Sequence, residues 1–312
     1  QALGIKVPER IATEYDAPPP IQRERLTAFL LGCLFNLARQ NPLLLIIEDV
    51  HWADPSTLEL LDKLTSSRLR LPILCIGSAR PEFIHTPSLA RIHTLPLAPL
   101  ASADCAAIVY GIAPQTTAAQ VSRIVERAEG IPLFAEELTR GFSTSQNVSI
   151  PASLEDVLGY RLTLLGPAKT TAQTAATIGR EFDSDFLKLL PAADALKVDR
   201  DLSRLVDASI IEEAGEQRYR FRHALIRDAA YQSQPPEARQ RTHAAIAEAL
   251  QKSPANTRPE HLAHHWAHAG HTDKAIKHWL AAGRQAMQQS ASREALAHFR
   301  AGLSHLEDLG PE

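Results

Sequence analysis

The chain contains little cysteine, almost no methionine and no long apolar run. Its cysteines, Cys33, Cys75 and Cys105, have no CxxC spacing and cannot all pair, which predicts reduced thiols, each a small buried apolar side chain. Aliphatic runs such as 43–47 fall far short of the ~20 residues that cross a bilayer, and no signal peptide opens the chain. We expect a cytoplasmic protein with no membrane partner. Because the only methionine is Met287, we also expect a processed or truncated product.

Charge of either sign is not in excess. The 33 Lys and Arg residues nearly balance the 36 Asp and Glu residues, with a formal net charge of −3. No bulk field would therefore draw the whole chain onto nucleic acid or an anionic membrane. Ordinary globular composition, 45% hydrophobic and 22% charged, supplies apolar material for cores in two or three domains.

The first third of the chain alternates predicted helices and strands. An apolar stripe at helical spacing predicts an amphipathic helix over 21–39 that needs a covering element. The run LLLII at 43–47 predicts a strand buried on both faces, and Asp54 before Pro55 predicts a helix start. After Pro72, ILCIGSA predicts a second strand. Short connections between these elements favour a parallel α/β sheet.

The rest of the chain is predicted to be mostly helical. Residues 102–141 read as helices, and the polar stretch Ser143 to Ser149 is the best candidate for a domain boundary. A capping box at Ser153 begins a further helix, and the segment 209–223 predicts two short strands around Gly215. Helices followed by such a hairpin suggest a winged helix.

A segment recurs near the C-terminal end. DKAIKHWLAAG at 273–283 aligns with REALAHFRAGL at 293–303, placing Trp279 over Phe299. The offset is shorter than a tetratricopeptide period, but pairs of small and aromatic residues on stacked helices are that architecture's packing device. We predict the start of a helical repeat array.

Two adjacent acids, Glu48 and Asp49, close the first predicted strand. A nucleoside triphosphate site needs an acid there, because the Mg²⁺ that bridges the phosphates is held by oxygen ligands and their waters. Glu48 would be the metal ligand, and Asp49 would orient or deprotonate the attacking water as general base. An acid pair after a strand can equally begin a solvated loop.

The longer segment IIEDVHWADPS, Ile46 to Ser56, resembles the Walker B region of the signal-transduction ATPases with numerous domains, the STAND class of P-loop NTPases. Within that class the chain is most similar to bacterial modules joined to class III adenylate cyclase domains and to large LuxR-type regulators. The resemblance covers nearly the whole chain. It implies ATP or ADP and Mg²⁺ as cofactors of the complete protein, in which nucleotide state controls an attached effector.

The resemblance also implies roles for residues outside this segment. Arg80, in GSARPE, would read the γ-phosphate, although a strand-end arginine can be an ordinary surface cation. Gly130 and Pro132, in GIPLFAEEL, match the GxP lid motif, whose proline region packs on the adenine. A bare Gly-x-Pro is otherwise a helix terminator.

His223, in FRHALI, matches the winged-helix histidine of the class. The resemblance implies that its imidazole contacts the β-phosphate of bound ADP and so locks a resting state. A lone histidine beside Tyr219 and Phe221 would otherwise be a satisfied core residue.

The predicted fold class is α/β plus mostly α. Four parts follow from the sequence and the resemblance: a partial P-loop parallel sheet at 1–100, a helical lid at 101–145, a winged helix at 146–235 and tetratricopeptide-like helical repeats at 236–312. A protein or small-molecule inducer would bind the repeats.

The sequence lacks the glycine-rich phosphate-binding loop of a P-loop nucleotide site. A GxxxxGK[ST] loop cradles the phosphates of P-loop proteins, but these 312 residues contain no Gly-Lys pair. We therefore expect a fragment that binds ATP weakly and does not turn it over, whereas its complete parent hydrolyses ATP slowly. The resemblance points to an adenylate cyclase domain upstream as the effector.

Two other protein classes stay open. The parent could be a LuxR-type transcription regulator with a DNA-binding domain beyond Glu312, or an interaction scaffold whose nucleotide site is vestigial. DNA contact through Arg218, Arg220 and Arg222 is possible, but solubility explains these charges more simply.

A histidine-rich segment, HLAHHWAHAGH, raises a metal hypothesis. His261, His265 and His268 share one helical face, which would suit zinc. The segment offers no acid or cysteine at ligand spacing, so helix packing is the simpler explanation.

Overall fold

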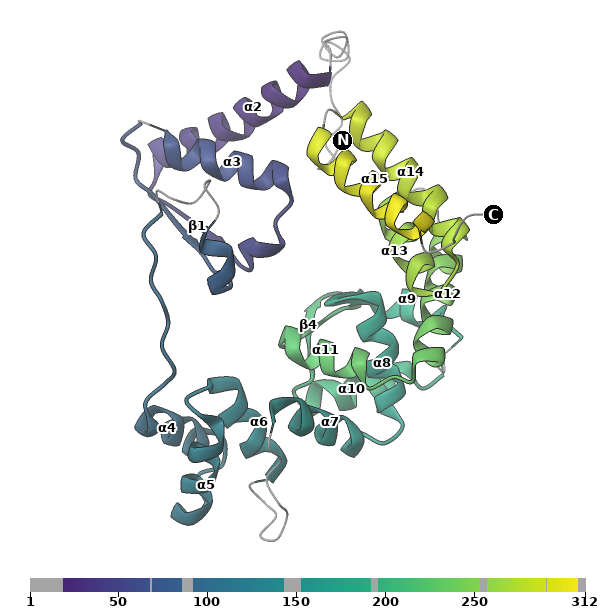
Figure 1. Cartoon of the computed structure of the whole chain (residues 1–312). Helices are drawn as coiled ribbons and strands as arrows, with labels where there is room; N and C mark the ends of the chain where they lie inside the picture. The colour runs from purple at the N-terminus through teal and green to yellow at the C-terminus, as the bar shows by residue number, and fades with distance from the viewer. Residues whose placement is uncertain are drawn as a thin grey trace. The chain divides into compact units, whose positions relative to one another are not determined.

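The computed structural model describes residues 19–67, 69–85, 92–142, 153–191, 196–252, 257–289 and 291–307. The chain divides into two compact units. Figure 1 colours it by residue number, from purple at the N-terminus to yellow at the C-terminus. One comprises Gln1–Pro96, Arg258–Ala263 and Thr272–Glu312, and the other comprises Leu97–Thr257 and His264–His271. The boundary predicted at Ser143 to Ser149 lies outside the described residues.

The N-terminal elements follow the predicted order. Strands β1 and β2 pair in parallel, with Leu43 opposite Ile73 and Ile47 opposite Gly77, so both strands and their direction are confirmed. Asp54 begins α3 as predicted, because its carboxylate accepts from the backbone N–H of Thr57. The elements are α2 (Pro19–Gln40), β1 (Leu43–Ile47), the 3₁₀ turn η2 (Val50–Trp52), α3 (Pro55–Ser66), β2 (Ile73–Gly77) and η3 (Pro81–His85).

Burial of the first strand on both faces was a wrong prediction for the described residues. Alternate side chains of β1 and β2 are exposed, so one face of this two-stranded sheet is not covered by the described part of the chain. The predicted stripe of α2 is also largely exposed, and Cys33 on it is exposed rather than buried. The exposed sheet residues are Leu44, Ile46, Leu74 and Ile76, and those of the helix are Leu26, Phe29 and Leu37.

The second unit begins with three short helices that share an apolar core. Val109, Ile124 and Leu138 are buried there, and Val157 of the following helix joins them. Thr117 starts the second helix with a full capping box. The elements are α4 (Ser102–Ile112), α5 (Ala118–Ala128), α6 (Pro132–Phe142) and α7 (Leu154–Leu164).

A larger core follows, in which helices pack against a three-stranded antiparallel sheet of order β3-β5-β4. The predicted hairpin is confirmed as β4 and β5, which meet with Ile211 opposite Phe221. Strand β3 was not predicted. The elements are α8 (Ala168–Ile178), β3 (Glu181–Asp183), α9 (Ser184–Lys188), α10 (Val198–Asp207), β4 (Ile211–Gly215), β5 (Arg218–Phe221), α11 (Ala224–Gln232) and α12 (Pro236–Lys252).

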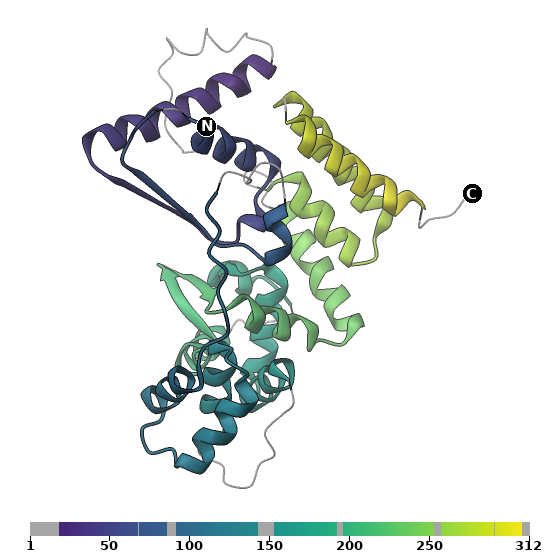
Figure 2. The ribbon, with the colours of Figure 1, turned by 60° about the vertical axis from the view of Figure 1, so that its left-hand side comes forward.

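The C-terminal segment is helical, as predicted. Helices α14 (Thr272–Gln288) and α15 (Ser292–Glu307) lie side by side as an antiparallel hairpin (Figures 1 and 2), after α13 (Pro259–His268). Gly283 lies against the ring of Phe299, and Gly302 lies close to the Cβ of Trp279. The small and aromatic residues of the aligned segments thus pack together. Among the described helices, none combines the length and apolarity that a membrane span requires.

Candidate functional site

The acid pair occupies the turn at the carboxyl end of β1. Asp49 lies in the left-handed region, with φ 53° and ψ 47°, a conformation that costs most side chains energy and that Asp tolerates better than most. Its backbone N–H donates to Ser78 Oγ at 2.9 Å. Val50 N–H donates to the Ser78 carbonyl at 2.8 Å, and Ser78 N–H donates to the Ile47 carbonyl at 3.0 Å. These hydrogen bonds therefore hold the turn against Ser78, the residue that follows β2.

Because β1 and β2 are parallel neighbours, Glu48, Asp49 and Arg80 follow adjacent strand ends within one unit. Glu48 and Arg80 are exposed and Asp49 is half-buried. The Arg80 carbonyl accepts from Phe83 N–H at 3.0 Å, where η3 begins. A Cβ at Gly77 would come within 3.0 Å of Val50 Cγ2, so a small residue suits this approach of the two turns.

Asp54 completes the segment after the acid pair. Its carboxylate accepts from Thr57 N at 2.9 Å and from Thr57 Oγ1 at 2.7 Å. Burial acts to raise the pKa of Asp54, but the hydrogen bonds from Thr57 and from the Ser56 backbone outweigh it, and the pKa lies below its usual range. Asp54 is thus an ionised helix cap, which fixes the direction of α3.

Gly130 and Pro132 form the junction of α5 and α6. Gly130 has φ 77°, and its carbonyl accepts from Leu100 N–H at 2.8 Å. A Cβ at this position would lie 2.6 Å from Pro99 Cβ and 2.7 Å from the Leu100 carbonyl oxygen, so only glycine fits. Pro132 is the exposed first residue of α6. The motif therefore ends one helix and starts the next.

His223 follows β5 and is the N-cap residue of α11. Its backbone is extended, with φ −134° and ψ 142°, and its imidazole makes no capping hydrogen bond to α11. The side chain is half-buried, whereas the neighbouring Phe221 is fully buried in the larger core. The His223 carbonyl begins the helical bonding of α11, because it accepts from Ile226 N–H at 3.1 Å and from Arg227 N–H at 3.3 Å.

The predicted site residues are divided between the two compact units. Glu48, Asp49 and Arg80 belong to one, and Gly130, Pro132 and His223 belong to the other. Sequence reasoning did not single out Ser78, although it lies inside the quoted segment GSARPE, next to the acid pair's strand in a parallel sheet. A role for all six residues in one nucleotide site stays a prediction.

In the parts of the chain that the structure describes, no three His, Cys, Asp or Glu side chains are arranged to hold a metal ion. The histidine-rich helix α13 uses its rings for packing and hydrogen bonding: His265 contacts His243 of α12, and His268 bonds the His264 carbonyl. The zinc hypothesis for this segment therefore has no structural support. The Mg²⁺ expected at Glu48 would not need such a cluster, because Mg²⁺ is commonly bound by one or two carboxylates together with waters and substrate phosphates.

No family model matches the chain, but comparisons with known proteins find a protein of similar sequence and solved structures of similar fold. A protein of unknown function from Rhizobium meliloti (strain 1021) is 29% identical over 320 residues, which cover 93% of this chain and 30% of that protein. A solved structure, the STAND protein with a tetratricopeptide repeat sensor from Pyrococcus horikoshii, superposes with a TM-score of 0.54 at 13% identity. The match covers 86% of this chain and 43% of that protein. The chain thus spans less than half of either relative, and its fold, mostly helical with small sheets, is like that of a STAND ATPase with a tetratricopeptide repeat sensor.

Proposed function

We propose that this chain is part of a nucleotide-dependent signalling regulator of the STAND kind. The observation that carries the proposal is the turn at Asp49, a left-handed acid fastened by hydrogen bonds to the exit of the neighbouring parallel strand. Ligands of open α/β sheets bind outside the carboxyl ends of the strands. The likeness in fold to a STAND ATPase supports the same assignment.

In the proposed site, Glu48 is the ligand of Mg²⁺ and Asp49 orients or deprotonates the attacking water. Solvent reaches both side chains, which suits a metal that keeps several of its waters. Arg80, exposed at the end of the next strand, contacts the γ-phosphate and senses whether it is present.

In this proposal Gly130, Pro132 and His223 serve the adenine and β-phosphate contacts. The exposed ring of Pro132 packs on the adenine, held by the turn that only Gly130 permits. His223 contacts the β-phosphate of ADP through an imidazole that is not used to cap α11. ADP and ATP then favour different conformations because they bind the two with different affinity.

The helical repeats bind the inducer, a protein or a small molecule, and the attached effector is an adenylate cyclase domain or, in the alternative, a LuxR-type DNA-binding domain. A scaffold with a vestigial nucleotide site is the remaining alternative. Because the sequence has no phosphate loop, residues 1–312 alone bind ATP weakly and do not hydrolyse it.

The test is the ATPase activity of the full-length protein with Asp49→Asn, against Glu82→Gln as the matched control. Glu82 is an exposed acid in η3, close in sequence to Arg80. D49N should lower kcat by about 10²-fold or more, as loss of a general base does, while E82Q should leave it unchanged. Equal activity of D49N and wild type would overturn the role of Asp49. No hydrolysis by the wild type would favour the scaffold, and steady hydrolysis by residues 1–312 would refute the predicted need for a phosphate loop.

A further inference from the structure

We propose that Glu137 and Arg161 are a positioning pair that fixes the segment carrying His223 relative to the helix that begins at Pro132. The pair lies inside the second compact unit. Its consequence for nucleotide binding rests on the proposed function, whereas its structural role does not.

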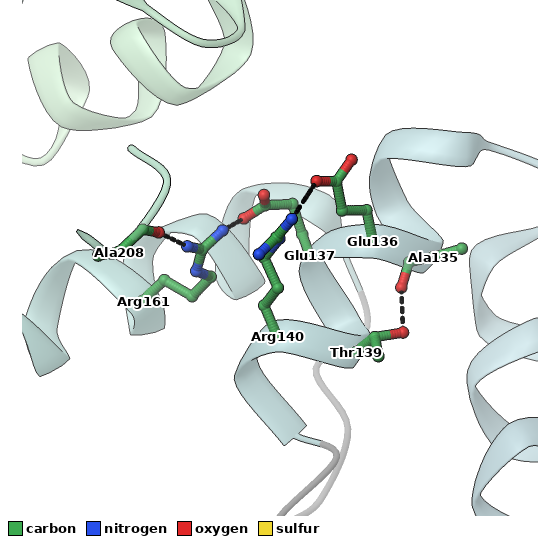
Figure 3. Close-up of polar contacts among 7 residues, drawn as sticks. All are labelled: Ala135, Glu136, Glu137, Thr139, Arg140, Arg161 and Ala208. Atoms are coloured by element: carbon green, nitrogen blue, oxygen red, sulfur yellow. Dashed lines mark hydrogen bonds and ion pairs between the residues drawn. The ribbon is translucent and has the colours of Figure 1, made fainter. Parts of the chain in front are cut away.

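Arg161 connects two elements that are distant in sequence. Its guanidinium donates from Nη1 to Glu137 Oε2 of α6 and from Nη2 to the carbonyl oxygen of Ala208, as Figure 3 shows. Arg161 is 7% exposed and Glu137 is 1% exposed. The planar fork of arginine reaches both partners at once, which the single ammonium group of lysine cannot do in the same geometry.

The Ala208 carbonyl lies at the C-terminal end of α10, where backbone carbonyls need a hydrogen-bond donor from outside the helix. Helix α10 closes with Ser209 in the left-handed region, φ 56°, and with the bonds Ser209 N–H to Val206 O and Ile210 N–H to Leu205 O at 2.8 and 2.9 Å. The Ala208 carbonyl lies at the negative end of the α10 dipole. The Arg161 cation satisfies it, and so fixes where the chain leaves α10.

Two backbone contacts connect the segment after Ala208 to the segment that carries His223. Ile210 begins the chain's entry into β4, and its carbonyl accepts from Arg222 N–H at 3.1 Å. The next pair along the ladder is Ile211 opposite Phe221. His223 directly follows Arg222, so the backbone position of His223 depends on where residues 208–210 are held.

Glu137, the other member of the pair, lies on the helix that begins at Pro132 of the GxP segment. Glu137 lies on α6 about one and a half turns after Pro132, and a short helix transmits its orientation as a rigid rod. Phe134 and Leu138 of the same helix are buried in the smaller core. A shift of α6 therefore displaces Glu137, Arg161 and the Ala208 turn together.

The burial of the pair makes it sensitive to the loss of either member. Removing one partner of a buried ion pair leaves the other charge uncompensated in a poorly solvated site. The same helix carries a matched comparison, because Arg140 bonds Glu136 at 2.9 Å in a more exposed pair that stays on α6 (Figure 3). Of these two pairs, only the buried one joins α6 to other elements, namely α7 and the end of α10.

The test measures amide hydrogen exchange of the full-length protein with Arg161→Met, with Arg140→Met as the control. R161M should raise exchange across residues 208–223 about tenfold or more, and should leave residues 168–178 of α8 unchanged. R140M should change neither segment. Adding Glu137→Gln to R161M should return part of the protection, because it removes the uncompensated carboxylate.

Two outcomes would overturn the positioning role: unchanged exchange at 208–223 in R161M, or an equal rise in every segment, which would indicate general destabilisation. If R161M does not fold, Arg161→Lys decides the matter. Lysine keeps the ion pair but cannot also hold the carbonyl, so exchange should still rise severalfold across residues 208–223, and unchanged exchange there would overturn the positioning role.

A second readout separates the pair from the proposed function. ADP with Mg²⁺ is titrated calorimetrically into the full-length protein, and R161M should weaken its affinity about tenfold while R140M should not. Local opening in R161M together with no ADP binding by the wild type would refute the nucleotide site and leave the positioning pair intact. ADP binding that is equal in wild type and R161M would refute the link between the pair and the site.

Discussion

His243 and His265 share a hydrogen bond between their Nδ1 atoms, at 2.9 Å, where α12 meets α13. The other ring nitrogen of His243 bonds the hydroxyl of Tyr231 at 2.9 Å, and its ring stacks on His268 at a centroid distance of 4.9 Å. Only one of the two Nδ1 atoms can carry a proton in this geometry, because a hydrogen bond needs one donor and one acceptor. Burial lowers the pKa of His243 to about 2, and the charges around it act in the same direction: those of His265, His268, His264 and Arg239.

We expect the protein to lose stability on mild acidification. In the unfolded chain His243 binds a proton as the pH falls below about 6.5, whereas in the folded chain it does not, so the unfolded state binds more protons. The free energy of unfolding should fall by about 2 kcal/mol between pH 6.5 and pH 5 on account of this residue. Urea unfolding at several pH values, with His243→Gln beside wild type, measures it.

Between pH 6.5 and pH 5, the free energy of unfolding of H243Q should fall by about 2 kcal/mol less than that of the wild type. His93→Gln removes an exposed imidazole and serves as the control, with the slope of the wild type expected. The same slope in H243Q and wild type would contradict the prediction.

Asp49 should tolerate asparagine but not a β-branched residue. Asn adopts the left-handed conformation readily, so Asp49→Asn should keep the free energy of unfolding within about 0.5 kcal/mol of wild type. Asp49→Val should cost about 1–2 kcal/mol, because its branched Cβ is crowded at positive φ. Chemical denaturation compares the two variants, and equal stability would show that the turn relaxes.

Gly130 should be far less replaceable than Gly166. Both have positive φ, 77° and 57°, but a Cβ at Gly130 would collide with Pro99 and Leu100, whereas nothing lies within 4 Å of one at Gly166. Gly166→Ala should cost about 1 kcal/mol for the backbone alone. Gly130→Ala should cost about 3 kcal/mol or more, because the collision adds to it. Thermal unfolding of both variants checks the ranking, and similar losses would refute it.

The repeat hairpin offers a test of its packing. Gly283→Ala would drive a Cβ into the ring of Phe299 and should destabilise the hairpin by about 1–3 kcal/mol. Phe299→Leu makes room on the facing helix, so the double variant should lose less than the sum of the two single variants. Additive losses in unfolding experiments would show that the two positions are not coupled.

Local sequence signals predicted much of the fold, because they act within a few residues. The run LLLII specifies a strand, Asp54-Pro55 specifies a helix start, and the segment around Gly215 specifies a hairpin. Each of these elements was confirmed, although the strand is not buried on both faces. Strand β3 was not predictable in this way. Its residues, Glu181 to Asp183, have no period long enough to read, and they form a strand only because β5 offers a partner.

The candidate site was predictable in its residues but not in its supports. Asp49 and Gly130 could be named from motifs, whereas the bond to Ser78 and the crowding by Leu100 depend on tertiary packing. Glu136 and Glu137 are adjacent acids with nothing in the sequence to separate them. Only the packing of α6 against α7 buries the second and leaves the first near solvent.

Helix α7 places Val157 in the smaller core of the second unit, while Leu158 and Leu162 lie in the larger one. Neither core can come apart without removing packing from a helix that the other requires. Residues 97–257 should therefore melt cooperatively, as a single calorimetric endotherm whose van't Hoff and calorimetric enthalpies agree, although they contain two separate apolar clusters.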